Sequence, residues 1–312
     1  DGPFIGLAQI GGQAPVSAVV VFIGGCVFLF VKRFKLRMII FPVLLSLFAS
    51  STLTKTQSEN ERGSMYHTEY GGPGNYSGMD GSSITQRILI VQGNAPERVG
   101  SSSSTQQEVF ATHLQLTSQM ASQVAQGSST RPDLVLWPEN STDIDPLNNE
   151  TARSQLSTVA SQIGSPILVG GVTWGGTPYG PRNEGVMWPV NGPVTQRYAK
   201  QHLVPFGEYL PLRSPLTKLI SRFNQISTDF IPGDRPGIFH AGTHLFGDLI
   251  CFEIAYDNHV STLIKRGASF ITLQTNNATY RGRGQADQQF TIARFRAIEH
   301  NRDVAVASTT GF

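Results

Sequence analysis

The sequence contains very little cysteine and almost no net charge. Two of its 312 residues are cysteines, and the formal net charge is +2. A balance this close to neutral gives no sign of the basic stripe that nucleic-acid-binding proteins carry. The seven histidines are scattered, and no Cys/His cluster has the spacing of a metal site. We therefore expect no nucleic-acid partner, no metal and no cofactor.

Charged residues are also missing near the N-terminus. Gly2 to Val31 contains none, and residues 16–31 are almost entirely apolar. A second apolar stretch runs from Met38 to about Leu53, and each stretch is close to the ~20 residues that cross a bilayer. A signal peptide would place its charges before the apolar core, whereas here they lie between two cores. Two transmembrane helices are favoured, and a buried hairpin in a soluble protein is the alternative.

The segment between the two stretches sets the expected orientation. It carries four cations within six residues: Lys32, Arg33, Lys35 and Arg37. Short loops rich in Lys and Arg stay in the cytoplasm, so the rest of the chain would lie on the opposite face of the membrane. We predict two transmembrane helices over residues 1–54 and a flexible linker or exposed loop over residues 55–83. Residues 84–312 would then form one domain on the extracytoplasmic face.

Strand and helix patterns alternate from residue 84 onwards. The expected strands are 87–91, 134–137, 167–174, 186–201 (as one or two strands), 245–251, 270–274 and 304–307, and the expected helices are 106–125, 151–163, 258–265 and 285–300. Gly170 and Gly171 are expected to break the third strand. Near-continuous apolar strands that alternate with helices predict an α/β domain whose sheets are covered by helices. Because the pattern stops directly after a strand, we expect the natural polypeptide to extend beyond both ends of this sequence.

A lone cysteine ends one of the apolar strands. Cys251 follows Leu245 to Ile250, and the other cysteine, Cys26, lies in the first apolar stretch, so the two are not expected to pair. A free thiol outside the cytoplasm is at risk of oxidation, which favours a chemical role for Cys251. A buried cysteine that packs as a small hydrophobe is the alternative.

Two further polar residues follow apolar strands. Glu139 comes after the strand that ends at Trp137, and Lys200 comes after Arg197-Tyr198. α/β domains build their sites at such strand ends. A carboxylate that takes a thiol proton, a thiolate that attacks a carbonyl and an ammonium that stabilises the oxyanion together suit acyl transfer. Taken singly, Glu139 and Lys200 could each be ordinary surface residues.

The order Glu139, Lys200, Cys251 resembles the nitrilase superfamily of carbon–nitrogen hydrolases. The segment RYAKQHLVPFGEYLP, residues 197–211, is similar to the signature of the apolipoprotein N-acyltransferases, the membrane branch of that superfamily. Other similar segments are VQGN (91–94), WPEN (137–140), CFEI (251–254), TNNATY (275–280) and RFRAIE (294–299). The resemblance covers essentially the whole chain. It implies a nitrilase-like α-β-β-α sandwich preceded by transmembrane helices.

The resemblance also implies roles for individual residues. Glu139 would be the general base, Lys200 the oxyanion stabiliser and Cys251 the nucleophile. Supporting roles are implied for residues at further matching family positions: Glu208, Phe252, Glu253, Asn276 and Glu299. Of these, Glu208 would assist the base, and the backbone N–H of Phe252 would complete the oxyanion hole.

The implied reaction is an acyl transfer. It would take place at a bacterial inner membrane, which the protein would span more than once. A phospholipid would donate an acyl chain to Cys251, and the α-amine of a diacylglyceryl-modified lipoprotein would accept it. Residues 203–230 interleave apolar and aromatic residues with cations, which suits an arm at head-group level. Phe206, Tyr209 and Leu210 are its expected lipid contacts, and an ordinary lid is the alternative. The rival functions are a membrane-tethered amidase or nitrilase that uses water, and a non-catalytic scaffold domain on a membrane anchor.

Overall fold

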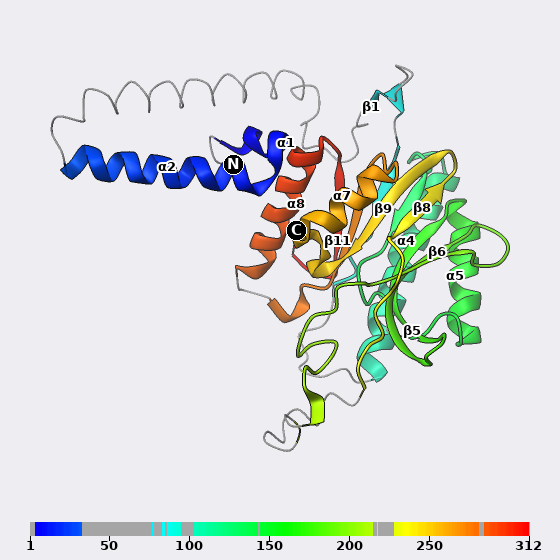
Figure 1. Cartoon of the computed structure of the whole chain (residues 1–312). Helices are drawn as coiled ribbons and strands as arrows, with labels where there is room; N and C mark the ends of the chain where they lie inside the picture. Colours follow the sequence, from blue (N-terminus) through cyan, green and yellow to red (C-terminus); the bar gives the residue numbers. More distant parts are fainter. Residues whose placement is uncertain are drawn as a thin grey trace. The chain divides into compact units, whose positions relative to one another are not determined.

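The computed structural model describes residues 4–32, 76–77, 83–84, 86–94, 103–142, 144–214, 217, 228–280 and 284–311. The chain divides into two compact units (Figure 1). One unit contains residues 1–85 and 294–302, and the other contains residues 86–293 and 303–312. The second unit holds both large sheets.

In the first unit, the first apolar stretch is helical. A 3₁₀ turn η1 (Ile5–Leu7) and helix α1 (Ala8–Gly11) precede helix α2 (Gln13–Lys32). Among the described residues, no helix combines the length and the apolar character that a membrane crossing requires. The second predicted stretch, residues 38–53, lies outside the described residues, so the predicted pair of spans stays a prediction. Within the predicted linker, β1 (Tyr76–Ser77) and β2 (Ser83–Ile84) form a small antiparallel pair, and the other linker residues lie outside the described part.

The second unit contains two sheets. The five-stranded sheet has the order β3-β4-β5-β6-β7, in which β3, β4 and β5 are parallel and β5, β6 and β7 are antiparallel. Its strands are β3 (Ile88–Ile90), β4 (Leu134–Leu136), β5 (Ile167–Gly175), β6 (Gly180–Trp188) and β7 (Gln196–Ala199). The four-stranded sheet has the order β11-β10-β9-β8, and only β8 and β9 pair antiparallel. Its strands are β8 (Ile238–Ala241), β9 (His244–Ile250), β10 (Ile271–Thr275) and β11 (Val304–Ser308).

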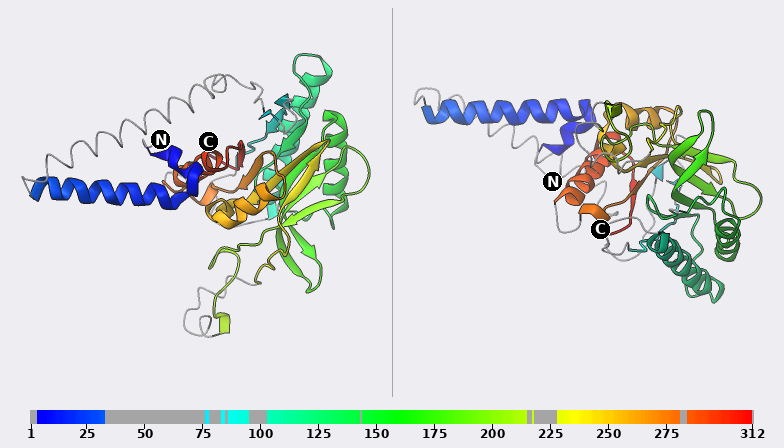
Figure 2. Two further views of the ribbon diagram at one scale, coloured as in Figure 1. Left: turned by 45° about the horizontal axis from the view of Figure 1, so that its top comes forward. Right: turned by 90° about the horizontal axis from the view of Figure 1, so that it is seen from below.

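The helices lie on the outer faces of these sheets (Figures 1 and 2). They are α4 (Ser103–Ala125), α5 (Glu150–Ile163), α7 (Asp257–Lys265) and α8 (Gln285–His300). Two short 3₁₀ helices, η4 (Cys251–Ala255) and η5 (Ala278–Tyr280), follow β9 and β10. Figure 2 shows α4 and α5 together on one flank of the sheets.

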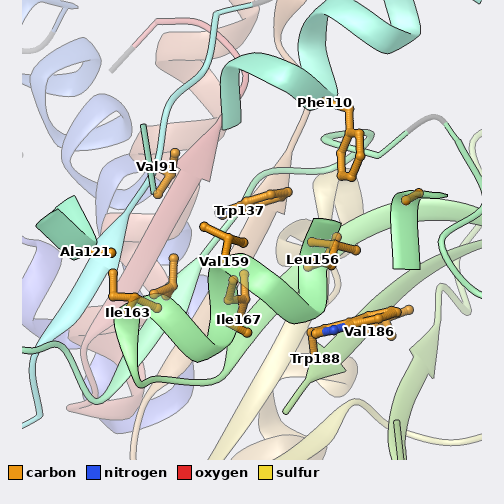
Figure 3. Packing of buried hydrophobic residues seen from close by; sticks show 14 residues of the cluster. Val91, Phe110, Ala121, Trp137, Leu156, Val159, Ile163, Ile167, Val186 and Trp188 are labelled. Carbon is orange, nitrogen blue, oxygen red and sulfur yellow. The ribbon is translucent and has the colours of Figure 1, made fainter. Parts of the chain in front are cut away.

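Alternate residues of a strand face opposite sides of its sheet, so apolar side chains pack on both faces. Three apolar layers hold the sandwich together in this way. In β4, Val135 packs against α4 and α5, whereas Leu134 and Leu136 pack against the other sheet. Figure 3 shows the first of these layers, with Trp137 beside Val159 of α5. A third layer joins the four-stranded sheet to α7 and the start of α8. The predicted α-β-β-α sandwich is therefore confirmed for this unit.

The structure corrects the sequence analysis at three strands. β5 continues through Gly170 and Gly171 to Gly175, so the predicted break is wrong. A Cβ on Gly170 would lie 2.4 Å from the Pro138 carbonyl oxygen, and one on Gly171 would lie 2.7 Å from the Thr142 carbonyl oxygen. Glycine is present because the chain that follows β4 crosses this strand at close range. In addition, β6 begins at residue 180 rather than 186, and β8 was not predicted.

Candidate active site

Three strand ends bring the predicted catalytic residues together. Glu139 follows β4, Lys200 directly follows β7, and Cys251 directly follows β9. Glu139 and Lys200 therefore come from the five-stranded sheet and Cys251 from the four-stranded sheet. The contacts below link all three.

The Glu139 carboxylate is buried and held at both oxygens. Its Oε1 accepts a hydrogen bond from Asn183 Nδ2 at 2.7 Å and faces Lys200 Nζ at 3.4 Å. Its Oε2 accepts a hydrogen bond from the backbone N–H of Asn276 at 2.9 Å. Asn276 in turn donates from its side chain to Asn140. These contacts fix the orientation of the proposed base and place Asn276 beside it, and the supporting role of Asn276 stays a prediction.

Lys200 is a buried ammonium between two carboxylates. Only 1% of the residue is exposed, and Nζ lies 3.0 Å from Oε1 of Glu208. Burial opposes the charge, but the negative charges of Glu139 and Glu208 outweigh it, so the pKa of Lys200 is raised. Lys200 therefore stays protonated at neutral pH, which suits the role predicted for it, that of a cation rather than a base.

Asn183 joins the two carboxylates and was missed by the sequence analysis. Its Nδ2 donates to Glu139 and, at 2.8 Å, to Oε1 of Glu208. The second oxygen of Glu208 accepts the backbone N–H of Val204 at 2.8 Å. Asn183 lies on the part of β6 that precedes the predicted strand, and no motif distinguishes it. Its position became evident only from the pairing of β6 with β5 and β7.

Cys251 lies at a sharp turn between β9 and η4. Its φ of 58° is unusual for a residue other than glycine, and such strain is concentrated at functional sites. Gln289 Nε2 of α8 lies 3.7 Å from Sγ, and Thr275, Glu139 and Lys200 lie close enough to affect the pKa of the thiol. Both Gln289 and Thr275 were missed by the sequence analysis. Gln289 belongs to no recognisable motif, and Thr275 was given no role although it opens the TNNATY segment.

The resting state of Cys251 is the protonated thiol. Burial and the charge of Glu139 together raise its pKa to about 12, although Lys200 and Thr275 oppose them. The thiolate is therefore scarce at neutral pH. Attack on a carbonyl would require a base that takes the thiol proton in the same step, which is the role predicted for Glu139.

Phe252 follows the thiol in η4. The first N–H groups of a helix have no acceptor within it, which suits the predicted use of the Phe252 N–H in an oxyanion hole. The Phe252 ring is 52% exposed and meets Tyr256 edge to face, with the ring centroids 6.0 Å apart. Its role in the oxyanion hole stays a prediction.

Glu253 is fully buried and links two parts of the site. Its Oε1 accepts the backbone N–H groups of Gln201 at 2.7 Å and His202 at 3.0 Å, just after Lys200. Its Oε2 accepts the N–H of Ile250 at 2.9 Å, just before Cys251. The Tyr198 hydroxyl donates to the same carboxylate. Glu253 therefore holds the chain at Lys200 against the chain at Cys251, which is a supporting rather than a chemical position.

The remaining predicted residues lie in different settings. Glu299 pairs with Arg296 on α8 and belongs to the first unit, so its role near the site stays a prediction. Phe206 is 53% exposed and Tyr209 is partly buried, whereas Leu210 is only 3% exposed. Much of the predicted lipid arm, residues 215–216 and 218–227, lies outside the described residues. Phe206 and Tyr209 are thus accessible to a ligand, and Leu210 packs inside.

Within the described part of the chain, no group of three or more His, Cys, Asp or Glu side chains could hold a metal ion. The site consists instead of a thiol, a carboxylate and an ammonium, supported by Asn183 and Glu208. Such a set can form and resolve a thioester.

Comparisons with known proteins agree with this geometry. The family model described as carbon–nitrogen hydrolase matches residues 88–312. The apolipoprotein N-acyltransferase of Mycolicibacterium smegmatis is 39% identical over 238 residues, which cover 74% of this chain and 39% of the relative. The Synechocystis enzyme of that name is 30% identical over 226 residues, covering 72% of this chain and 41% of the relative. The chain therefore spans about two fifths of the length of these curated relatives.

Among solved structures, a carbon–nitrogen hydrolase superfamily protein from Xanthomonas campestris aligns with a TM-score of 0.48 and 17% identity. The alignment covers 72% of this chain and 76% of that chain.

Proposed function

We infer the function from the fact that this chain belongs to the carbon–nitrogen hydrolase family. The proposed reaction transfers an acyl chain from a phospholipid, through a thioester on Cys251, to the N-terminal α-amine of a diacylglyceryl-cysteine lipoprotein. One observation carries the proposal, namely that the Cys251 thiol lies within electrostatic reach of the buried Glu139 carboxylate, whose Oε1 lies 3.4 Å from Lys200 Nζ. The names of the two curated relatives supply the reaction class and the acceptor, which is an apolipoprotein, and the phospholipid donor is our proposal.

In the first half-reaction, Glu139 takes the thiol proton as Cys251 Sγ attacks the ester carbonyl of the donor. The carbonyl oxygen becomes an oxyanion, which the Lys200 ammonium and the Phe252 N–H stabilise. Collapse of this intermediate breaks the C–O bond, and Glu139 returns the proton to the leaving lysophospholipid. The acyl chain remains on Cys251 as a thioester.

In the second half-reaction, the neutral α-amine of the acceptor attacks the thioester carbonyl. Glu139 accepts the proton that the amine loses, and the same two groups stabilise the second oxyanion. Collapse breaks the C–S bond, Glu139 protonates the departing thiolate, and the product is an amide. The resting thiol and carboxylate are restored.

A membrane location follows from the substrates and from the apolar N-terminus. Five apolar side chains of α2 are about half exposed or more: Val20, Val21, Phe22, Val27 and Phe28. The proposed arrangement has two spans within residues 1–54, a cytoplasmic turn at residues 32–37 and the catalytic unit on the extracytoplasmic face of a bacterial inner membrane. The test is labelling of cysteines introduced at Arg33 and at exposed Gln162 in intact cells with an impermeant reagent. Labelling at Arg33 without permeabilisation would contradict the orientation.

The experiment for the reaction measures two products from one donor. Purified protein is given a labelled phospholipid in vesicles, with and without a diacylglyceryl-cysteine peptide. The proposal requires label on the peptide amine, with little free fatty acid. Release of free fatty acid at the same rate with or without the peptide would indicate a hydrolase, and no turnover would indicate a scaffold domain.

A further inference from the structure

A polar pair lies in the apolar layer between the two sheets, close beneath the site. Asp248 on β9 and Gln274 on β10 are both fully buried, on the same strand faces as Phe246, Ile250 and Phe270, which pack between the sheets. Asp248 precedes Cys251 by three residues, and Gln274 precedes Asn276 by two. Neither has a role in the proposed reaction, so their burial requires a separate explanation.

The orientation of the Gln274 amide is fixed by its neighbours. Nε2 donates to the Trp137 carbonyl at 2.6 Å and faces the Leu168 carbonyl at 3.4 Å. Carbonyl groups only accept hydrogen bonds, so the NH₂ group must point towards them. Oε1 therefore points away, and it has no hydrogen-bond partner among the described residues.

Asp248 presents a second oxygen without a partner. Its Oδ1 accepts the Thr272 hydroxyl at 2.7 Å, and its Oδ2 has no partner in the described part of the chain. A Cβ built on Gly185 would lie 2.5 Å from Asp248 Oδ2 and 2.9 Å from Gln274 Oε1. The two unpartnered oxygens thus converge over the same glycine of β6. A deprotonated Asp248 Oδ2 and Gln274 Oε1 are both hydrogen-bond acceptors, so neither can satisfy the other. Both stay without a hydrogen bond unless a proton lies between them.

The charges around Asp248 also disfavour a carboxylate there. The groups that act on it are Glu253, which is an acid, and the hydroxyls of Thr272 and Tyr198, which are neutral. Burial, reinforced by Glu253 and opposed by the Thr272 hydroxyl and the Leu249 backbone N–H, raises the pKa of Asp248 well above its ordinary value.

We propose that Asp248 is a neutral carboxylic acid that donates its proton to Gln274 Oε1, and that this pair positions the catalytic base. Through Gln274 the pair holds the Trp137 carbonyl, two residues before Glu139. The end of β10, the strand that carries Gln274, also supplies the Asn276 N–H that binds Glu139. A residue of the four-stranded sheet thereby fixes the end of β4 in the five-stranded sheet. The positioning role rests on the proposed function, whereas the protonation of Asp248 does not.

The test combines three variants with readouts that do not depend on acyl transfer. Asp248→Asn keeps both hydrogen bonds, because its NH₂ can donate to Gln274 and its carbonyl can accept from Thr272. Gln274→Met removes the donor to Trp137 and the acceptor for Asp248. Gln162→Met on the exposed side of α5 is the matched control. Each purified protein is examined by infrared spectroscopy, thermal unfolding, alkylation of Cys251 against pH, and turnover.

The wild type should show the carbonyl band of a protonated carboxylic acid up to pH 9, and Asp248→Asn should remove it. Asp248→Asn should keep the wild-type melting temperature, and its kcat should stay within about twofold. Gln274→Met should lower kcat by about tenfold with KM little changed. It should also move the alkylation profile towards lower pH, since Glu139 is displaced from the thiol, and Gln162→Met should do neither.

Two results would overturn the inference. A missing carboxylic-acid band together with a strongly destabilised Asp248→Asn would mean that Asp248 is ionised. Wild-type alkylation and kcat in Gln274→Met would mean that the pair does not position the base. Absence of acyl transfer in the wild type would refute the proposed function alone, because the infrared and alkylation measurements would still decide this inference.

Discussion

The two sheets contribute different chemistry to one site. The five-stranded sheet supplies the charged groups, Glu139 after β4 and Lys200 after β7, together with Asn183 on β6. The four-stranded sheet supplies an uncharged thiol at Cys251 and the backbone N–H of Asn276. Neither sheet holds a complete acyl-transfer set. The chemistry therefore depends on how the sheets stack, and contacts between them matter as much as the residues that react.

The two sheets also use different backbone features to place their reactive residues. At the five-stranded sheet, glycines of β5 let the chain after β4 approach closely, so Glu139 is placed by packing. At the four-stranded sheet, Cys251 is placed by a turn with a positive φ. Variants on each side should consequently fail in different ways.

Loss of the thiol should have the largest effect. Cys251→Ala removes the group that carries the acyl chain in the proposed reaction, so turnover should fall by about 10⁴-fold or more. Far-UV circular dichroism should remain that of the wild type. An acylated protein in the alanine variant would show that the four-stranded sheet does not supply the nucleophile.

Glu139→Gln should separate base catalysis from thiol acidity. Acyl transfer should fall by about 10³-fold because no group takes the thiol proton. Since the charge of Glu139 raises the pKa of Cys251, its removal should shift iodoacetamide alkylation of Cys251 towards lower pH. Turnover and alkylation should thus change in opposite directions, and a fall in both would contradict the stated electrostatics.

Lys200→Arg should lower turnover by about 10²-fold, although the charge is kept. The side chain is 1% exposed and confined between Glu139 and Glu208, where a planar guanidinium cannot replace a compact ammonium. Arg182→Lys, on the same sheet but outside these contacts, is the control. Steady-state kinetics that find Lys200→Arg near the wild type would remove Lys200 from the oxyanion role.

The five-stranded sheet should also weaken in mild acid through His113. The ring is buried, its Nδ1 donates to the Val109 carbonyl, and Nε2 accepts the N–H of Gly93. Burial, opposed by the Val109 bond, lowers its pKa to about 4. The unfolded chain therefore binds more protons below about pH 6.5, and the free energy of unfolding should drop by about 3 kcal/mol as pH falls from 6.5 to 4.

Chemical denaturation at several pH values would check this. His113→Gln should flatten the acid slope, and His240→Gln, at an exposed position, should leave it unchanged. An unaltered slope in His113→Gln would assign the acid loss to other groups.

The smallest expected effect concerns lipid access. Phe206→Ser with Tyr209→Ser should lower kcat/KM for phospholipid vesicles by about tenfold, and for a short soluble ester by no more than about twofold. Leu210 is left unchanged because it is buried, and Leu116→Ser on α4 is the control. Equal losses on both donors would mean that the segment is ordinary packing around the site.

Local patterns predicted most of this architecture. The alternating strands and helices were found because burial on both faces makes a strand such as β4 a continuous apolar run. Glu139, Lys200 and Cys251 were selected as candidates because each comes at or shortly after the end of a predicted strand. The groups that depend on pairing between distant segments were not predictable. Asn183 reaches the carboxylates only through the register of β5, β6 and β7, and no sequence pattern encodes that register.

The predicted break in the strand that contains Gly170 and Gly171 was wrong for a related reason. Gly170 and Gly171 indicate a break when they are considered locally, but their neighbours are the backbone of Pro138 and Thr142. The hydrogen bonds that Glu253 accepts from the backbone N–H groups of Gln201 and His202 also join distant segments of the chain. Their geometry could therefore not be derived from the sequence.

The most direct test of the central claim is intact-mass and peptide mass spectrometry of the protein after incubation with phospholipid. The account predicts a mass increase of one acyl chain on the Cys251 peptide. The adduct should be removed by hydroxylamine and discharged by a diacylglyceryl-cysteine peptide with formation of its amide. Turnover without any adduct on Cys251, or an adduct that the amine acceptor cannot discharge, would contradict it.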